Sequence, residues 1–96
     1  MTEESYPVSE VTLEALEGTP LQHEAIRRIV VATAEAVAER QGVRIVQINT
    51  STSSITIQVV GEEIVAIGLI AELRRLTTNW YEHKFGVGRL WGSGPN

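Results

Sequence analysis

The fold is decided by residues 43–60, which read VRIVQINTSTSSITIQVV. Both ends of this stretch are rich in Val and Ile, and at its second end apolar residues alternate with polar ones, as in a half-buried strand. The five residues between the two ends, 50–54, are all Thr or Ser, which suits a hairpin loop. The stretch therefore predicts two antiparallel strands, 43–49 and 55–60.

The first of these strands carries apolar side chains in both directions. Strict alternation places Val43 and Ile45 on one face and Arg44, Val46 and Ile48 on the other. A lone two-stranded hairpin is marginal in water, and its edges need partners. We therefore expect a homodimer or higher homo-oligomer, in which two hairpins join into a four-stranded sheet or the second helices of two copies bury each other.

Helices are predicted on both sides of the hairpin. Thr19 and Pro20 read as the cap and first residue of a helix that ends near Gln41, before Gly42. A second helix begins at the acidic pair 62–63 and runs to about Lys84. The order helix-hairpin-helix (αββα) predicts a small two-layer α+β domain over residues 19–86.

The two flanking segments are predicted to lie outside this domain. Residues 1–18 contain five glutamates and only a weak apolar spacing, which indicates a flexible acidic arm with at most a short turn of helix. Val11, Leu13 and Leu16 are the arm's candidates for packing onto the body or a neighbour. Residues 87–96 are a glycine-rich tail.

The first half of the second helix is apolar nearly all round, which predicts cover on more than one side. Ile64, Ile67, Gly68 and Ala71 are its candidate interface residues. A glycine in mid-helix costs about 1 kcal/mol relative to alanine. We therefore expect Gly68 at a close helix crossing, within the chain or across a dimer axis.

Aromatic residues are concentrated near the C-terminus. Trp80 continues the leucine stripe of the second helix and is predicted to lie in the core, whereas Trp91 is an anchor in the tail that lands on its own subunit or on another. The candidate binding residues are Tyr81, His83, Arg89, Leu90 and Trp91.

The one candidate for acid-base chemistry is His83. Its neighbour Glu82 projects about 100° away on a helix and cannot orient the imidazole, so Asn79, one turn earlier, is the better partner. The pair His83 and Lys84 also suits a helix end, where cations interact with the last carbonyl groups, and this interpretation is favoured.

Composition excludes several classes of function. The 96 residues carry a net charge of -4 and no cysteine, which opposes nucleic-acid binding and excludes disulfides and thiolate-ligated metals. No phosphate-binding loop or histidine metal motif is present. The expectation is no cofactor, no metal, no nucleic-acid or membrane partner, and a cytoplasmic location, because the N-terminus has no secretory pattern.

These patterns favour a small homo-oligomeric binding or scaffold module that acts through hydrophobic contacts of its second helix and its aromatic tail. A protein partner other than a second copy is also compatible with them. The alternative is a small ligand-binding protein or enzyme with a subunit-interface pocket near Trp80, His83 and Arg89.

Overall fold

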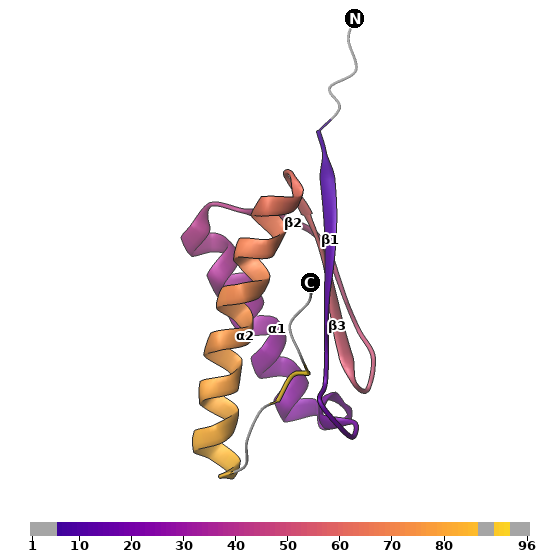
Figure 1. The fold of residues 1–96 in the computed structure, drawn as a ribbon, viewed down its shortest axis with the longest axis vertical. Coiled ribbons are helices and arrows are strands. Elements are labelled where there is room, and N and C mark those ends of the chain that lie inside the picture. The colour runs from indigo at the N-terminus through magenta and orange to yellow at the C-terminus, as the bar shows by residue number, and fades with distance from the viewer. Residues whose placement is uncertain (1–5, 87–89, 93–96) are drawn as a thin grey trace, which may run out of the picture.

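The computed structural model describes residues 6–86 and 90–92. In chain order its elements are β1 (Val8–Glu14), a 3-10 turn (Pro20–Gln22), α1 (Glu24–Gln41), β2 (Arg44–Thr50), β3 (Ser54–Val60) and α2 (Glu63–Phe85). The strands form one antiparallel sheet in the order β1-β3-β2, and both helices lie against the same face of it (Figure 1). The result is a small α+β domain in which β3 fills the gap of a split β-α-β unit.

The N-terminal segment differs from the sequence prediction. Val8–Glu14 form a strand that pairs with β3 over its full length, where the sequence indicated at most a turn of helix. Along this strand Val11 and Leu13 lie opposite the buried side of β3, while Glu10 and Glu14 are exposed. The alternation was hidden because glutamate has a low strand propensity, and pairing with a strand far along the chain overrides that local preference.

The first helix begins later than its capping signal suggests. The Thr19 hydroxyl donates to Gln22 Oε1 at 3.0 Å and accepts no bond from a backbone N–H, so it does not cap α1. Instead, Leu21 is fully buried and its N–H donates to the Thr52 carbonyl at 2.9 Å. This anchor to the hairpin loop holds the segment as a separate 3-10 turn, and α1 starts at Glu24.

The two predicted strands and their antiparallel pairing are confirmed, with one change of register. A bulge between Ile45 and Gln47 places Ile45 opposite Val59 and Ile48 opposite Ile57. Both partners on β3 are buried, so Ile48 faces the helices together with Ile45 instead of facing away from it. The bulge thereby turns inward one of the two apolar residues that strict alternation placed on the outer face, while the other, Val46, stays 52% exposed.

The C-terminal ends of both helices agree with the sequence prediction. Gly42 has a left-handed φ of 71°, and the N–H of Val43 donates to the Ala38 carbonyl at 2.8 Å, which closes a Schellman motif. The second helix spans the predicted range and ends before Gly86, whose φ is 70°.

The core lies between the helices and the inner face of the sheet, whereas the outer face is polar. The Thr12 and Thr56 hydroxyls are 2.8 Å apart across β1 and β3, and Gln58 Nε2 donates to Glu10 Oε1 at 3.0 Å. Because polar side chains cover this face, it needs no second layer. The sheet's third strand also comes from the same chain, so the hairpin acquires one partner without a second copy.

Candidate functional site

The C-terminal anchor packs onto its own subunit. Trp91 is 0% exposed and Leu90 is 2% exposed, and Trp91 forms an isolated antiparallel bridge with Ala15, just beyond the end of β1. Trp91 Nε1 donates to the Thr77 hydroxyl at 2.8 Å, and that hydroxyl donates to the Leu73 carbonyl at 2.6 Å. Leu90 and Trp91 therefore belong to the core and present no side-chain surface to a partner.

Further hydrogen bonds fix the same segment to both layers. Leu16 N–H donates to the Leu90 carbonyl at 3.0 Å, and Gly92 N–H donates to the Glu14 carbonyl at 2.8 Å. From α2, Arg74 Nη1 donates to the Gly92 carbonyl at 2.7 Å. The segment 90–92 thus ties the end of β1 to the middle of α2.

Three further aromatic residues, Trp80, Tyr81 and Phe85, cluster at the end of α2. The Trp80 and Phe85 rings meet edge to face at 6.0 Å, and the Tyr81 and Phe85 centroids are 4.9 Å apart. Trp80 is only partly buried and packs against the edge of the core, so its predicted core position is met in part. Of the two outcomes left open for Trp91, the structure shows the first, because its indole is enclosed in its own subunit. The C-terminal end of α2, which carries this cluster, extends beyond the end of the sheet (Figure 1).

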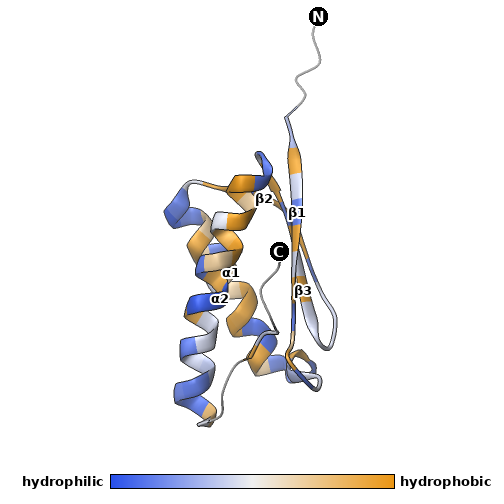
Figure 2. Ribbon diagram, viewed as in Figure 1, coloured by the Kyte–Doolittle hydropathy of each residue, from blue (hydrophilic) through white to orange (hydrophobic). Residues whose placement is uncertain are grey.

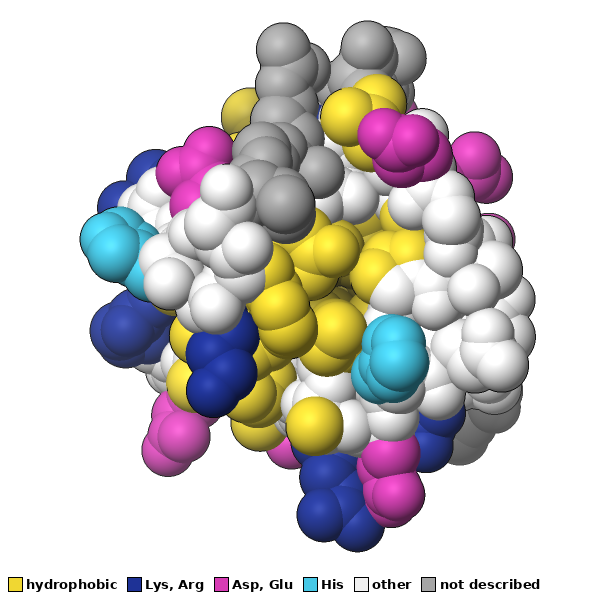
Figure 3. All heavy atoms as spheres, turned by 90° about the horizontal axis from the view of Figure 1, so that it is seen from below, with side chains coloured by type: hydrophobic (Ala, Val, Ile, Leu, Met, Phe, Trp, Pro, Cys, Tyr) yellow, Lys and Arg dark blue, Asp and Glu magenta, His cyan; other side chains and the backbone are white. Residues whose placement is uncertain are grey.

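A hollow of about 370 Å³ lies beside this cluster, at the end of the molecule where hydrophobic side chains are visible from below (Figure 3). Its lining combines the segment before α1 with the first turns of α1 and the end of α2, and consists of Glu17, Gly18, Thr19, Pro20, His23, Ile26, Tyr81 and Phe85. Tyr81 is the predicted binding residue that borders this hollow.

His83 does not join this hollow as an acid-base group. Its side chain is exposed, and its Nδ1 lies 2.8 Å from the backbone carbonyl of Asn79, one turn earlier. Asn79 is thus the partner that the sequence predicted, but it contacts the ring through its backbone carbonyl. This carbonyl fixes the orientation of the imidazole and cannot exchange a proton with it. Arg89 lies outside the described residues.

The four predicted interface residues do come together, on the face of α2 that points away from the sheet. Ile64 is 77% exposed and Ile67 is 45% exposed, while Gly68 and Ala71 are also exposed. Spacings of three and four residues place all four on one strip of the helix, which we call the α2 stripe. Figure 2 shows that this first half of α2 is the more hydrophobic half.

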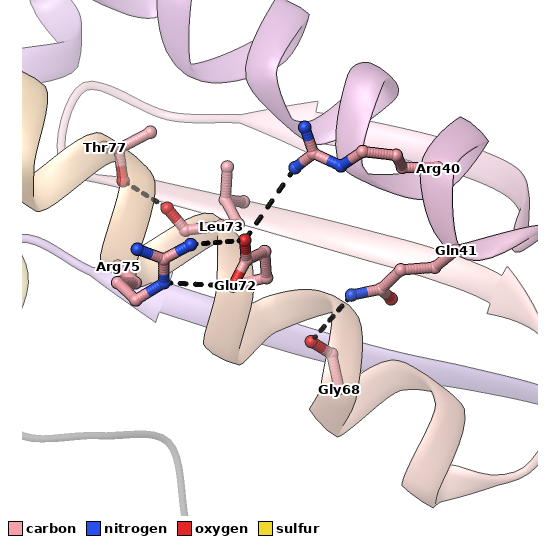
Figure 4. A network of polar contacts seen from close by, with 7 residues as sticks. All are labelled: Arg40, Gln41, Gly68, Glu72, Leu73, Arg75 and Thr77. Atoms are coloured by element: carbon pink, nitrogen blue, oxygen red, sulfur yellow. Dashed lines mark hydrogen bonds and ion pairs between the residues drawn. The ribbon is translucent and has the colours of Figure 1, made fainter.

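Gly68 has no close neighbour that explains it. A Cβ atom built at this position meets nothing within 4 Å, so the expected helix crossing is absent from the described part of the chain. The Gly68 carbonyl accepts a long hydrogen bond of 3.5 Å from Gln41 Nε2 at the end of α1 (Figure 4). The glycine leaves a shallow, open point in the centre of the α2 stripe.

One side of the α2 stripe is bordered by an ion-pair network. Arg75 donates through Nε and Nη2 to the two carboxylate oxygens of Glu72, at 3.1 and 2.6 Å, and Arg40 of α1 lies 3.8 Å away (Figure 4). The hydrogen bond from Arg75 is the main cause that lowers the pKa of Glu72; desolvation opposes it, and the charges of Arg75 and Arg40 lower the pKa further. These charged groups limit the apolar surface to the first half of α2.

A second concave surface was not predicted from the sequence. A groove of about 700 Å³ runs between α1 and the outer edge of β2, and its lining comprises Arg27, Arg28, Val31, Ala32, Glu35, Ile45, Val46, Gln47, Ile48 and Thr50. It could not be predicted, because the bulge that turns Ile48 toward α1 has no recognisable local sequence pattern. We call it the α1–β2 groove.

No protein family matches this chain, and no curated protein matches its sequence. Neither α1 nor α2, the two long helices of the described ranges, combines the length and apolar character that a membrane crossing requires. Within residues 6–86 and 90–92, no three histidine or acidic side chains gather in a way that would hold a metal ion.

Proposed function

We propose that the chain is a small homo-oligomeric interaction or scaffold module whose contact surface is the α2 stripe. The observation that carries this proposal is the exposure of two isoleucines beside a mid-helix glycine at which an added Cβ atom would meet nothing within 4 Å. A strip of apolar surface on an otherwise charged domain is typical of a protein contact. In this proposal homo-oligomerisation also extends the sheet across a subunit boundary.

A second copy suits the α2 stripe better than an unrelated partner because the strip is self-complementary. When two α2 helices pack antiparallel about a two-fold axis between Ile67 and Gly68, each Ile67 lies over the Gly68 of the other copy and each Ile64 over Ala71. Large residues thus face small ones throughout. The same arrangement brings Arg75 of one helix toward the acidic start of the other, at Glu63.

The C-terminal segment takes an indirect part in this proposal. Because Trp91 and Gly92 bond to Thr77 and Arg74, they brace the half of α2 that follows the α2 stripe. A helix held on one side by the sheet and at its centre by this segment loses little further freedom on association, which favours binding.

Ile67→Glu tests the contact. The charge would be buried against the second copy, so we expect the variant to have a lower molecular mass in light scattering than the parent chain at the same concentration. Ala25→Glu is the matched control, because it adds the same charge at an exposed position in the first turn of α1. If Ile67→Glu keeps the parent mass, the proposed contact does not exist.

Gly68→Ala provides a second readout that does not depend on added charge. The methyl group meets nothing in the isolated subunit, so the helix should gain about 0.5–1 kcal/mol of unfolding free energy under conditions where the chain is monomeric. In the paired helices the same methyl group occupies the space of Ile67, so association should weaken. Stronger association of the Gly68→Ala variant would contradict the antiparallel arrangement.

A second candidate function is the binding of a small apolar or aromatic ligand in the hollow beside Tyr81 and Phe85. The exposed rings and the volume of about 370 Å³ favour it. The alternative predicted from the sequence was a pocket at a subunit interface near Trp80, His83 and Arg89. This hollow differs from it because it lies within one subunit. Trp80 contacts Phe85 and serves as the reporter.

Tryptophan fluorescence against a panel of small aromatic metabolites checks this candidate. A ligand in the hollow should shift the emission of the chain in a saturable way, and Phe85→Ala should abolish the shift. Because Trp91 is enclosed, its emission supplies a constant background. A panel in which no compound produces a saturable shift would remove the candidate.

A further inference from the structure

The α1–β2 groove has two walls of different character. On the α1 wall, Val31 and Ala32 lie between a basic end at Arg27 and Arg28 and an acidic end at Glu35. On the β2 wall, Ile45 and Ile48 contribute apolar surface. The groove is therefore apolar in the middle, positive at one end and negative at the other.

The β2 wall also offers backbone hydrogen-bonding groups. Ser51 N–H donates to the Ser54 carbonyl at 2.9 Å, which makes this the first hydrogen-bonded pair of the hairpin. Bonded and non-bonded pairs alternate along an antiparallel ladder, so the N–H and C=O groups of Thr50 and Ile48 point away from β3. Among the described residues, β2 has no partner on this side. A further strand can pair here.

We propose that the occupant of the α1–β2 groove is the same groove of a second copy, with the two β2 strands paired antiparallel in one continuous six-stranded sheet. The inference rests on the homo-oligomeric state proposed above, but it uses a surface separate from the α2 stripe. The distribution of charge selects this occupant. A two-fold axis between Val31 and Ala32 places Arg28 of each copy beside Glu35 of the other, whereas a uniformly acidic peptide would meet Glu35.

The strand and the helix agree on where this axis lies. The point between Val31 and Ala32 is about 14 Å from the end of α1 at 1.5 Å per residue. Four residues of β2, from Arg44 to Ile48, cover about 13 Å in the same direction. A single two-fold axis can therefore pass both the middle of the apolar wall of α1 and Ile48 of β2. The N–H and C=O groups of Ile48 then pair with those of Ile48 in the other copy.

The ion pairs of the free subunit are compatible with this contact. Arg28 bonds Glu24 at 2.7 Å, and its side chain is 75% exposed. Its guanidinium has further donors available for a second carboxylate. Because Glu24 and Glu39 do not line the groove, the pair of facing charges at each end is Arg28 with Glu35.

A charge exchange tests the proposal with the full chain. We expect Arg28→Glu and Glu35→Arg each to raise the dissociation constant of the groove contact about 10- to 30-fold, because each variant replaces two ion pairs per dimer by two like-charge pairs. The double variant should regain the parent association. An equimolar mixture of the two single variants should form a heterodimer, because their opposite charges then face each other.

Light scattering and native mass spectrometry of the mixture give the decisive readout. All three variants alter exposed side chains, and circular dichroism checks that each one is folded. If the mixture contains no heterodimer, or if the two single variants associate as the parent does, the groove does not bind a second copy.

The Ile67→Glu background separates this inference from the proposed function. The three possible cases differ when the chain concentration is near the dissociation constant of the groove contact. If both surfaces associate, Ile67→Glu alone leaves a dimer through the groove, and adding Arg28→Glu shifts that dimer toward the monomer. If only the groove associates, Ile67→Glu keeps the parent mass while Arg28→Glu alone lowers it. If only the α2 stripe associates, Ile67→Glu alone yields a monomer and the groove inference is wrong.

Discussion

Trp91→Ala is expected to lower the free energy of unfolding by about 4 kcal/mol. The substitution empties the volume of a fully buried indole, and the cavity term adds to the lost transfer free energy. It also deprives the Thr77 hydroxyl of its buried donor. Because the free energy of unfolding of a domain of this size is about 5–14 kcal/mol, the substitution would remove a large part of it.

Urea unfolding followed by circular dichroism measures this effect. The matched control is Trp80→Ala, which removes the same side chain from a partly buried position and should cost about 1–2 kcal/mol. Similar losses for the two variants would show that Trp91 does not occupy the enclosed position described above.

Leu13→Ala is expected to lower the free energy of unfolding by about 3 kcal/mol, whereas Leu16→Ala should change it by about 0.5 kcal/mol or less. The side chain of Leu13 is 1% exposed on the inner face of β1, and that of Leu16 is 50% exposed just beyond the strand. The two substitutions remove the same atoms three residues apart, so the difference between them reports burial alone.

Urea unfolding of the two leucine variants also tests whether the N-terminal segment belongs to the sheet. A flexible acidic arm would tolerate both substitutions equally. An equally small loss for both would therefore contradict the pairing of β1 with β3.

The sequence predicted those elements whose signals are local. The hairpin and α2 were confirmed because a few neighbouring residues specify each: alternation in 55–60, the Thr and Ser loop, and the glycine after each helix. β1 was missed because its partner is about 50 residues away in the chain, and its glutamates suggest solvent. The bulge in β2 was missed because nothing near Val46 announces it.

The same distinction applies to the candidate sites. Spacing along one helix was sufficient to group Ile64, Ile67, Gly68 and Ala71 on a single exposed strip. The position of Trp91 and the α1–β2 groove depend on contacts between segments that are distant in the chain. The periodicity of the sequence carries no information about such contacts, so neither feature could be predicted.

The position of β3 at the centre of the sheet has a consequence for biosynthesis. β1 leaves the ribosome first, yet its pairing partner begins only at Ser54, after α1 and β2 have been made. The β2–β3 hairpin closes a short loop, whereas joining β1 to β3 closes a loop that includes a whole helix and therefore has a larger entropic barrier. During synthesis the apolar residues of β1 therefore have no strand to pair with, and the charges of Glu10 and Glu14 beside them favour solvation of the nascent segment.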